Sequence, residues 1–411
     1  MTYDSRLIQE TLARAQRALH EGDLSRANRL LQRLHAAGHA GASSHQMLAI
    51  IAADLGLFEH AKRHMDESQR LVPASDGRPR YLLIRAWGAG FWADVLHTIH
   101  GLALAEATGR TPIVHWGREC RYRRAGIEEA WRLYFEPVSA LTLADVEHDN
   151  LTYFPPKWTR ANLREIRVNK DQGEWSQLSG LFLLNRPEDV AILDFFTELD
   201  DLGPWFPPGH PLGGADPEPE LGRLFRRHLR LVPALAEELE RQVAAMIPRR
   251  PAIAMHFRTQ ALPKVTESTN RKALEPGPFV DVIAKYLTIH PDAAIYLMTD
   301  FAPAVLYLRT VFGDRVSCRD VTRLERIAEE SLEIHPKYDG AVLGQEIVLD
   351  TFLAAQCDAF VGDGASGVSQ AVTRLKDWPT GAVTLLRPGP TALPGQIRRH
   401  ADPSPWWNPT E

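Results

Sequence analysis

Short apolar segments alternate with helical segments along the second half of the chain, and this alternation constrains the fold more than any other feature. The apolar segments are four to six residues long and lie at 252–257, 294–299, 315–318, 359–362 and 382–386. Helical patterns separate them, near 277–289, 303–312, 342–356 and 366–376. Strands and helices that alternate this often form a parallel sheet with helices on both faces. The sequence therefore predicts a doubly wound α/β domain.

A β-α-β pattern also occurs upstream, where an apolar run at 81–87 precedes a helical run at about 91–107 and a second strand at 111–116. Short connections of this kind make the two strands parallel. The region 125–200 gives only a mixed pattern of short helices and strands. The proline-rich stretch at 203–220 cannot continue a helix or an interior strand, so it separates two α/β units.

These boundaries predict two Rossmann-type domains with a cleft between them. The first spans 80–220 and the second 221–390, which begins with one long helix at about 221–247. A proline-rich tail at 391–411 is expected to wrap over the surface. Ligands of such sheets bind at the carboxyl ends of the strands.

Residues 1–75 contain a repeat of a helical pattern with a period of 34 residues. Four pairs of similar residues recur at this spacing: Gly22 and Gly56, Leu24 and Phe58, Ala27 and Ala61, and Leu31 and Met65. The spacing resembles the tetratricopeptide repeat (TPR), although two unrelated helical hairpins would give a similar pattern. Two units are fewer than a free solenoid needs. We therefore expect an all-helical TPR-like segment that docks on the next domain, on a protein partner, or on a second copy of the chain.

The composition indicates a soluble globular protein. The 411 residues carry a net charge of −5, and 44% of them are hydrophobic. No apolar run is long enough to span a membrane, and the mild acidity argues against nucleic-acid binding. The three cysteines, Cys120, Cys318 and Cys357, lack the spacing of a disulfide framework or a zinc site. A cytoplasmic location is expected.

A glycine-rich turn follows the strand at 81–87. Gly88, Gly90 and Ala93 match the G-x-G-x-x-[GA] pattern. The amides near Trp92 and Ala93, at the start of the next helix, would point at a diphosphate. A dinucleotide site also needs an acidic residue at the end of the second strand, which here ends His115-Trp116. The pattern therefore argues against NAD or FAD, and it leaves a phosphate-binding turn or a plain tight turn.

Polar residues follow the strand at 252–257. His256 and Arg258 share one face of the strand end, and Phe257 points to the opposite, buried face. An arginine at this position can bind a phosphate through two parallel hydrogen bonds, although a surface salt bridge is the commoner use. Lys264 and Glu267 follow on the next loop.

Three further polar residues lie near strand ends. Asp300 ends the strand at 294–299, where it can bind a ligand or cap the next helix. Asp350 lies on the helix that leads to the strand at 359–362. Ser366 follows that strand, where its hydroxyl can bind a phosphate or act as an ordinary N-cap. Together these residues suggest a nucleoside diphosphate bound between two sheets.

The order of these motifs resembles the α-1,6-fucosyltransferase family, which includes nodulation-factor and core fucosyltransferases, with protein O-fucosyltransferases as more distant relatives. The resemblance covers roughly residues 80–387. Its carriers are 88–92, 109–116, Arg121-Tyr122, His256-Phe257-Arg258, 264–267, 295–300 and the interval from Asp350 to Ser366.

The resemblance implies a GT-B fold, with the acceptor on the first Rossmann-type domain and the nucleotide sugar on the second. It implies an inverting transfer of L-fucose from GDP-β-L-fucose to a hydroxyl of a glycan or protein acceptor. Arg258 would bind the β-phosphate and Glu267 would be the catalytic base, with Lys264 beside it. The remaining nucleotide-binding residues would be Gly90, Trp92 and Ala93 at the turn, Tyr122 at the ribose, His256 and Asp350 at guanine, Asp300 at its strand end, and Ser366 at phosphate.

The sequence departs from the family in several ways. Many relatives carry a second arginine after His-x-Arg, where this chain has Thr259, and the loop from His256 to Glu267 differs slightly in length. The membrane anchor, stem and SH3-like domain of animal relatives are not visible, which favours a bacterial, cytoplasmic protein.

Metal and cofactor are both expected to be absent. The chain has no Asp-x-Asp triplet, so a metal bound to the diphosphate is not required, and the resemblance implies no cofactor. Three alternatives stay open: another nucleotide-sugar transferase on the same fold, a Rossmann oxidoreductase, and a non-catalytic TPR scaffold with a vestigial nucleotide cleft.

Overall fold

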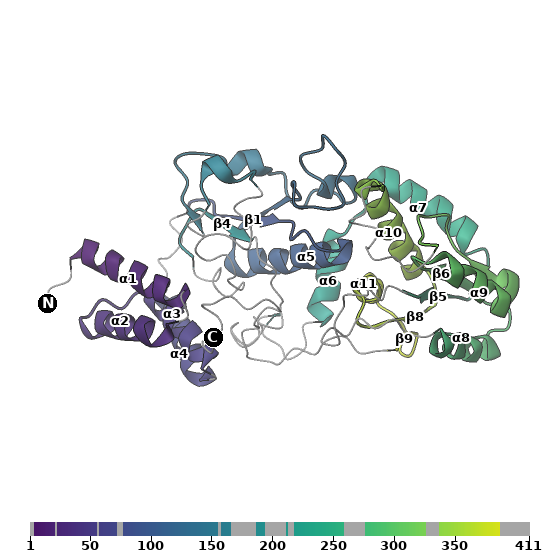
Figure 1. Ribbon diagram of the computed structural model, residues 1–411, viewed down its shortest axis with the longest axis horizontal. Helices are drawn as coiled ribbons and strands as arrows, with labels where there is room; N and C mark the ends of the chain where they lie inside the picture. Colours follow the sequence, from purple (N-terminus) through teal and green to yellow (C-terminus); the bar gives the residue numbers. More distant parts are fainter. Residues whose placement is uncertain are drawn as a thin grey trace.

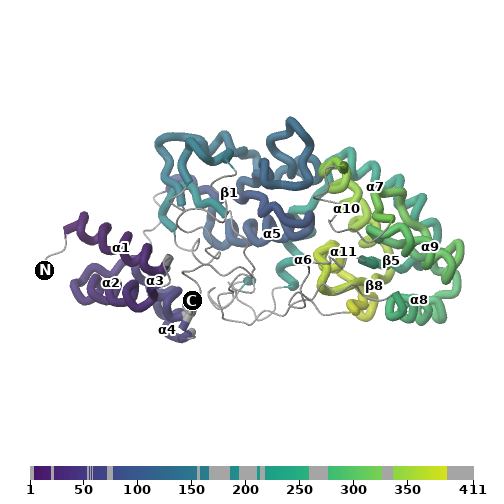
Figure 2. The backbone as a smooth tube through the Cα atoms, viewed as in Figure 1, coloured from purple at the N-terminus to yellow at the C-terminus, as the bar shows by residue number. Residues whose placement is uncertain are grey.

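A helical N-terminal segment is followed by two parallel sheets with their covering helices (Figure 1). The computed structural model describes residues 4–20, 23–55, 57–71, 77–154, 158–165, 186–193, 211–212, 218–258, 276–325 and 337–386. The N-terminal helices lie at one end of the molecule, and helices α8 (Gly277–Ile289) and α9 (Ala302–Phe312) lie at the other (Figures 1 and 2). The predicted α/β class with an N-terminal helical segment is confirmed.

The N-terminal segment contains four helices: α1 (Ser5–His20), α2 (Leu24–Ala36), α3 (Ala42–Asp54) and α4 (Phe58–Leu71). Helix α1 packs against α2, and α3 packs against α4. Ala27 and Ala61, which the 34-residue spacing pairs, are both fully buried, as are Leu31 and Met65. The two members of each of these pairs are therefore equally buried. The small alanine side chains also let the paired helices approach closely. The TPR class stays a prediction, and the turn glycines of the repeat lie outside the described residues.

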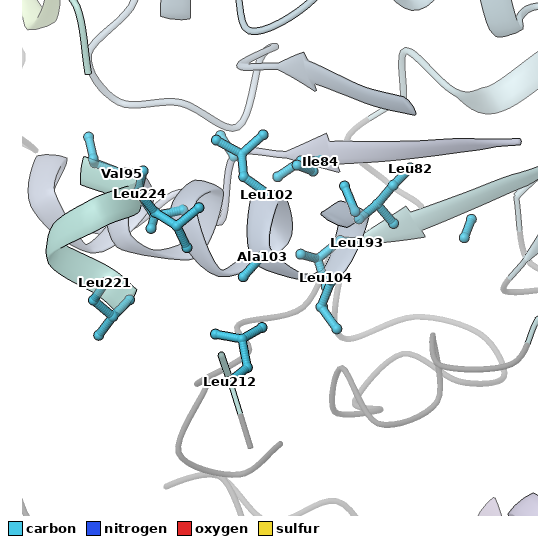
Figure 3. Packing of buried hydrophobic residues seen from close by; sticks show 14 of the residues in the cluster. Leu82, Ile84, Val95, Leu102, Ala103, Leu104, Leu193, Leu212, Leu221 and Leu224 are labelled. Atoms are coloured by element: carbon cyan, nitrogen blue, oxygen red, sulfur yellow. The ribbon is translucent and has the colours of Figure 1, made fainter. Parts of the chain in front are cut away.

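The first sheet has the strand order β2-β1-β4-β3, and every pairing in it is parallel. Its strands are β1 (Tyr81–Arg85), β2 (Thr111–His115), β3 (Tyr153–Phe154) and β4 (Val190–Leu193). The predicted β-α-β unit is confirmed, with α5 (Phe91–Thr108) between its strands. Figure 3 shows Leu82 and Ile84 of β1 together with Leu193 of β4 beside Leu102 and Leu104 of α5. This packing fixes α5 against the sheet.

The second sheet has the strand order β7-β6-β5-β8-β9 and is also entirely parallel. Its strands are β5 (Ala252–His256), β6 (Ala294–Met298), β7 (Val316–Ser317), β8 (Ala359–Gly362) and β9 (Val383–Leu385). Counted along this unit, the order is 3-2-1-4-5, which is the Rossmann order. The chain reverses direction across the sheet between β5 and β8, and ligands of such sheets bind beyond the carboxyl ends of the strands at this point.

The single helix predicted at 221–247 is wrong, because the structure has two helices there. Helix α6 (Glu218–His228) and helix α7 (Pro233–Met246) are separated by a short extended segment. Pro233 is the first residue of α7, a position that tolerates proline because its missing N–H would have no partner inside the helix. The proline therefore starts a new helix instead of interrupting a continuous one.

Helix α10 (Gly340–Ala355) packs against β5, β6, α7 and α11 (Gly367–Arg374) of the second unit, and it also contacts the first unit. Any side chain at Gly344 would collide with the Tyr134 hydroxyl, and any side chain at Gly340 would collide with the Arg121 carbonyl. The Thr351 hydroxyl accepts a 2.9 Å hydrogen bond from the Trp92 indole. Small residues along α10 thus let it reach the aromatic cluster at the start of α5 and join the two units.

Candidate functional site

The ends of β5 and β8 lie side by side at the reversal point of the second sheet. Met255 pairs with Val361 in register, so His256 and the segment that begins at Gly362 leave the sheet together. Phe257 is buried and meets the Phe279 ring edge-on at 5.2 Å, as the alternation predicted. The structure therefore brings together three of the predicted site residues, namely His256, Arg258 and Ser366.

His256 is buried and its Nδ1 lies 2.8 Å from the Ser369 hydroxyl. Burial lowers the pKa of the imidazole to about 3, and the nearby Arg258 guanidinium lowers it further, while Asp363 opposes the shift. His256 is consequently neutral at physiological pH and acts through hydrogen bonds. Arg258 is half-buried at the same strand end.

Gly362 makes this arrangement possible. A Cβ atom there would lie 2.5 Å from the Ser369 hydroxyl and 2.6 Å from the Phe360 ring. Only glycine lets the end of β8 pass so close to the residue that positions His256.

The loop from β8 to helix α11 (Gly367–Arg374) is held by its own hydrogen bonds. The Asp363 carboxylate accepts from the Ala365 amide at 3.0 Å, and the Asp363 carbonyl accepts from the Ser366 amide at 3.0 Å. Ser366 is the N-cap residue of α11, but its side chain makes no capping hydrogen bond. Its hydroxyl is buried without a partner among the described residues. The ordinary N-cap alternative is therefore excluded, and a buried hydroxyl is left available at a helix N-terminus.

Asp300 lies just beyond β6 and is half-buried. Its carbonyl accepts the Leu324 amide at 2.9 Å. The N-cap residue of α9 is Phe301, so Asp300 lies one residue before the cap position of the next helix.

Asp350 lies on α10 and forms a polar network with the second sheet. Its Oδ1 accepts 2.9 Å and 2.8 Å hydrogen bonds from the Tyr296 hydroxyl and the Arg319 guanidinium. Burial raises the pKa of the Asp350 carboxyl, and Arg319 and Tyr296 oppose this shift. Both hydrogen bonds fall on the same oxygen, and the side chain keeps 14% of its surface exposed. The two hydrogen bonds therefore fix the orientation of a carboxylate that is largely buried.

The backbone amides of the glycine-rich turn in the first unit are bound by a side chain of the helix that follows it. The Asp94 carboxylate accepts hydrogen bonds from the amides of Trp87, Gly88 and Ala89, at 3.0, 3.3 and 3.2 Å. Burial raises the pKa of the Asp94 carboxyl to about 6, while these amides lower it. Asp94 thus occupies the amides of 87–89, which favours a plain tight turn there, while the phosphate-binding role predicted for the amides near Trp92 and Ala93 stays a prediction.

The three residues predicted to bind nucleotide at this turn have other contacts. The Ala93 amide donates to the Gly90 carbonyl at 2.9 Å. The Trp92 indole is 4% exposed and binds Thr351, as described above. Gly90 is the N-cap of α5 in an extended conformation.

Tyr122 lies in the hydrophobic core, with 2% of its surface exposed. Its ring meets Phe91 edge-on at 5.2 Å, and its carbonyl accepts a hydrogen bond from the Tyr134 hydroxyl. In this conformation the ring is not accessible to a ribose. Lys264 and Glu267 lie outside the described residues.

Asp94, Ser369 and Arg319 were not predicted from the sequence. Asp94 had a detectable signal, because an acidic side chain in the first turn of a helix is suited to bind free amides. Ser369 and Arg319 had none, because their partners are 113 and 31 residues away in the chain.

Three kinds of comparison with known proteins were made. Neither protein-family models nor curated protein sequences match the chain. Among solved structures, a fucosyltransferase NodZ from Bradyrhizobium is similar at 14% identity and a TM-score of 0.44, covering 72% of this chain and 93% of that one. POFUT1 in complex with GDP-fucose is similar at 13% identity and a TM-score of 0.46, covering 77% of this chain and 99% of that one. The fold described above rests on the two parallel sheets and not on these similarities.

Two features are absent from the described residues. In that part of the chain, no helix is long and apolar enough to cross a membrane. The same residues contain no group of three or more histidine, cysteine or acidic side chains placed to hold a metal ion.

Proposed function

We propose that the chain is a glycosyltransferase that binds the diphosphate of a nucleotide sugar at the ends of β5 and β8. The observation that carries this proposal is the Ser366 hydroxyl, which is buried at a helix N-terminus with no hydrogen-bond partner among the described residues. An unsatisfied buried hydroxyl costs about 1–3 kcal/mol. A phosphate oxygen at this position would relieve that cost, and the N-terminus of α11 would favour its negative charge.

Arg258 would provide the positive charge. It leaves the strand next to β8, and its charge acts on the buried His256 ring of the same site. When the bond between sugar and diphosphate breaks, negative charge builds on the β-phosphate. A guanidinium already in place stabilises this charge more than it stabilises the bound donor, which is the requirement for catalysis.

The donor and the base are proposed from the sequence motifs. The resemblance of 256–258, 264–267 and 350–366 to fucosyltransferase motifs favours GDP-β-L-fucose as donor and an inverting transfer to a glycan or protein hydroxyl. Asp350, held in orientation by two neighbours, suits the N–H donors of guanine. Glu267 would accept the proton of the acceptor hydroxyl, with Lys264 beside it.

The turn at 87–90 has a supporting role in this proposal. Asp94 already binds the amides of 87–89, so the turn would not contact phosphate. Instead, the turn would hold α5 and Trp92 against α10.

A donor panel tests the function. Thermal-shift and hydrolysis measurements with GDP-fucose, GDP-mannose, UDP-glucose and dTDP-glucose, all in EDTA, should give stabilisation and sugar release with GDP-fucose. Stabilisation by a UDP or dTDP sugar alone would keep the fold and the site but overturn the donor. A chain that binds GDP without releasing or transferring the sugar would instead be a non-catalytic nucleotide-binding scaffold.

A further inference from the structure

Four exposed arginines lie within seven residues on the loop that follows β2. They are Arg118, Arg121, Arg123 and Arg124, and we call this segment the arginine loop. Across the described parts of the chain, none of the four side chains forms an ion pair or a hydrogen bond. The whole chain has a net charge of −5, so this positive charge is a local concentration.

The acidic residues around the arginine loop are engaged elsewhere. Among the described residues they are Glu119, in a buried ion pair with Arg85; Glu128, in an ion pair with Arg164; Glu129, which accepts backbone amides of 116 and 131; Asp339, which caps α10; and Asp94, which lies near Arg121 and accepts the amides of 87–89. Within the described ranges, no carboxylate therefore lies in ion-pair contact with the four exposed guanidinium groups. Such a cluster repels itself unless an anion binds it.

The arginine loop borders the candidate site on the side of the first unit. A side chain at Gly88 would lie 3.0 Å from the Glu119 carbonyl, and α10 begins against the Arg121 carbonyl. The start of α5, which follows Gly88, contacts the start of α11, where a side chain at Gly367 would lie 3.4 Å from the Trp92 Cβ. The loop and the start of α11, which follows Ser366, therefore both approach the segment 88–92.

We infer that the arginine loop binds the acceptor and that this acceptor is a glycan carrying phosphate groups. The inference rests on the proposed function, because it assigns the substrate class of the same site. Guanidinium groups match phosphate oxygens with two parallel hydrogen bonds each. A phosphomonoester carries nearly two negative charges at neutral pH, so two such groups balance four arginines. A glycan with one carboxylate per sugar would need four consecutive sugars to balance the same four arginines, all within a loop of seven residues.

Two other anions fit the arginine loop less well. The donor diphosphate has its own proposed site at the second sheet, around Arg258 and the buried Ser366 hydroxyl. Nucleic acid requires a broad basic face, whereas this chain is acidic overall and concentrates its positive charge on one short loop.

A binding experiment on the full chain tests the inference. The probe is a synthetic oligosaccharide with two phosphomonoesters, compared with the same oligosaccharide after phosphatase treatment and with a single-stranded oligonucleotide of equal charge. The variant Arg118→Gln/Arg123→Gln/Arg124→Gln removes three charges and keeps Arg121, whose carbonyl packs on α10. The control Arg14→Gln/Arg17→Gln/Arg29→Gln removes three exposed charges from the N-terminal helices. GDP affinity is measured for every protein.

The expected result is binding of the phosphorylated oligosaccharide that weakens about 10- to 100-fold in the loop variant and less than twofold in the control. GDP affinity should not change in either variant. Equal binding of the two oligosaccharides, unchanged binding by the loop variant, or tighter binding of the oligonucleotide would each overturn the inference. A parallel loss of GDP affinity would also overturn it, by showing that the loop binds the donor. If the wild type binds the phosphorylated probe but not GDP, the proposed function fails and the anion site stands.

Discussion

The indole N–H of Trp92 donates a 2.9 Å hydrogen bond to the hydroxyl of Thr351, which lies 259 residues further along the chain. Trp92 lies in the first turn of α5, which packs on the first sheet, and Thr351 lies on α10, which leads to β8 of the second. Both side chains are buried. This hydrogen bond is therefore part of the contact between α5 and α10, which connects the first unit to the second.

Thr351→Val should weaken the contact between α5 and α10 and lower the free energy of unfolding. The substitution keeps the shape of the side chain but leaves the Trp92 N–H buried without an acceptor, which costs about 1–3 kcal/mol. Chemical denaturation should detect this loss in the free energy of unfolding. Thr310→Val is the matched control, because Thr310 also bonds the carbonyl four residues earlier in its helix but lies at the surface. Equal effects of the two substitutions would show that the indole contributes nothing.

Asp94→Asn should change how stability depends on pH. The carboxyl of Asp94 has a pKa of about 6 in the folded chain, against an ordinary value of 3.8, so the folded state binds the proton more tightly than the unfolded state does. Its contribution to stability is therefore fully present below about pH 4 and is lost as the pH rises through 6. Asparagine cannot ionise and lacks this loss.

The measurement for Asp94 is the unfolding free energy of both proteins between pH 4 and pH 7.5. The wild type should lose about 2–3 kcal/mol relative to Asp94→Asn over this range. A difference that stays constant with pH would mean that Asp94 titrates normally and that the turn amides dominate its surroundings.

Gly362→Ala should disturb the candidate site by displacing the residues that position His256. The new methyl group would displace the Ser369 hydroxyl from His256 and press on the Phe360 ring, at a cost of about 1–3 kcal/mol. GDP affinity should fall together with thermal stability. Gly277→Ala is the control, because nothing lies within 4 Å of a side chain at that position. If both glycines tolerate alanine equally, the close packing at the end of β8 is not required.

Ser366→Ala separates binding from stability. The Ser366 hydroxyl has no partner among the described residues, so its removal should leave the free energy of unfolding unchanged or slightly higher. GDP affinity should fall about tenfold, because a hydrogen bond to a charged oxygen is lost. Calorimetric titration and thermal denaturation measure the two effects. A loss of stability without a loss of affinity would assign the hydroxyl to the fold.

The sequence predicted the elements of the two sheets well where strands and helices alternate regularly. It missed β4, because Val190–Leu193 lies in a region without a clear pattern, and yet this strand pairs directly with β1. It joined α6 and α7 because a proline at the first position of a helix resembles one inside it. The first error concerns a strand that is fixed by tertiary pairing, and the second concerns a local proline signal with two possible meanings.

The candidate site was predictable only in part. His256, Arg258 and Ser366 could be placed together because each follows a strand, and parallel strands end at one edge of the sheet. The turn at 87–90 could not be resolved, since a free amide and one bound by Asp94 have the same sequence pattern. The burial of the Tyr122 ring depends on its packing against Phe91 of α5, which no local sequence pattern predicts.

The central claim is that Arg258 binds the diphosphate of a guanosine nucleotide at the end of β5. Calorimetric titration of GDP into wild type, Arg258→Ala and Arg249→Ala tests it most directly, because Arg249 is an exposed arginine at the opposite end of the same strand. We predict that Arg258→Ala weakens GDP binding about 10- to 100-fold and that Arg249→Ala leaves it within twofold. Equal affinities in all three proteins, or no GDP binding by the wild type, would contradict the account.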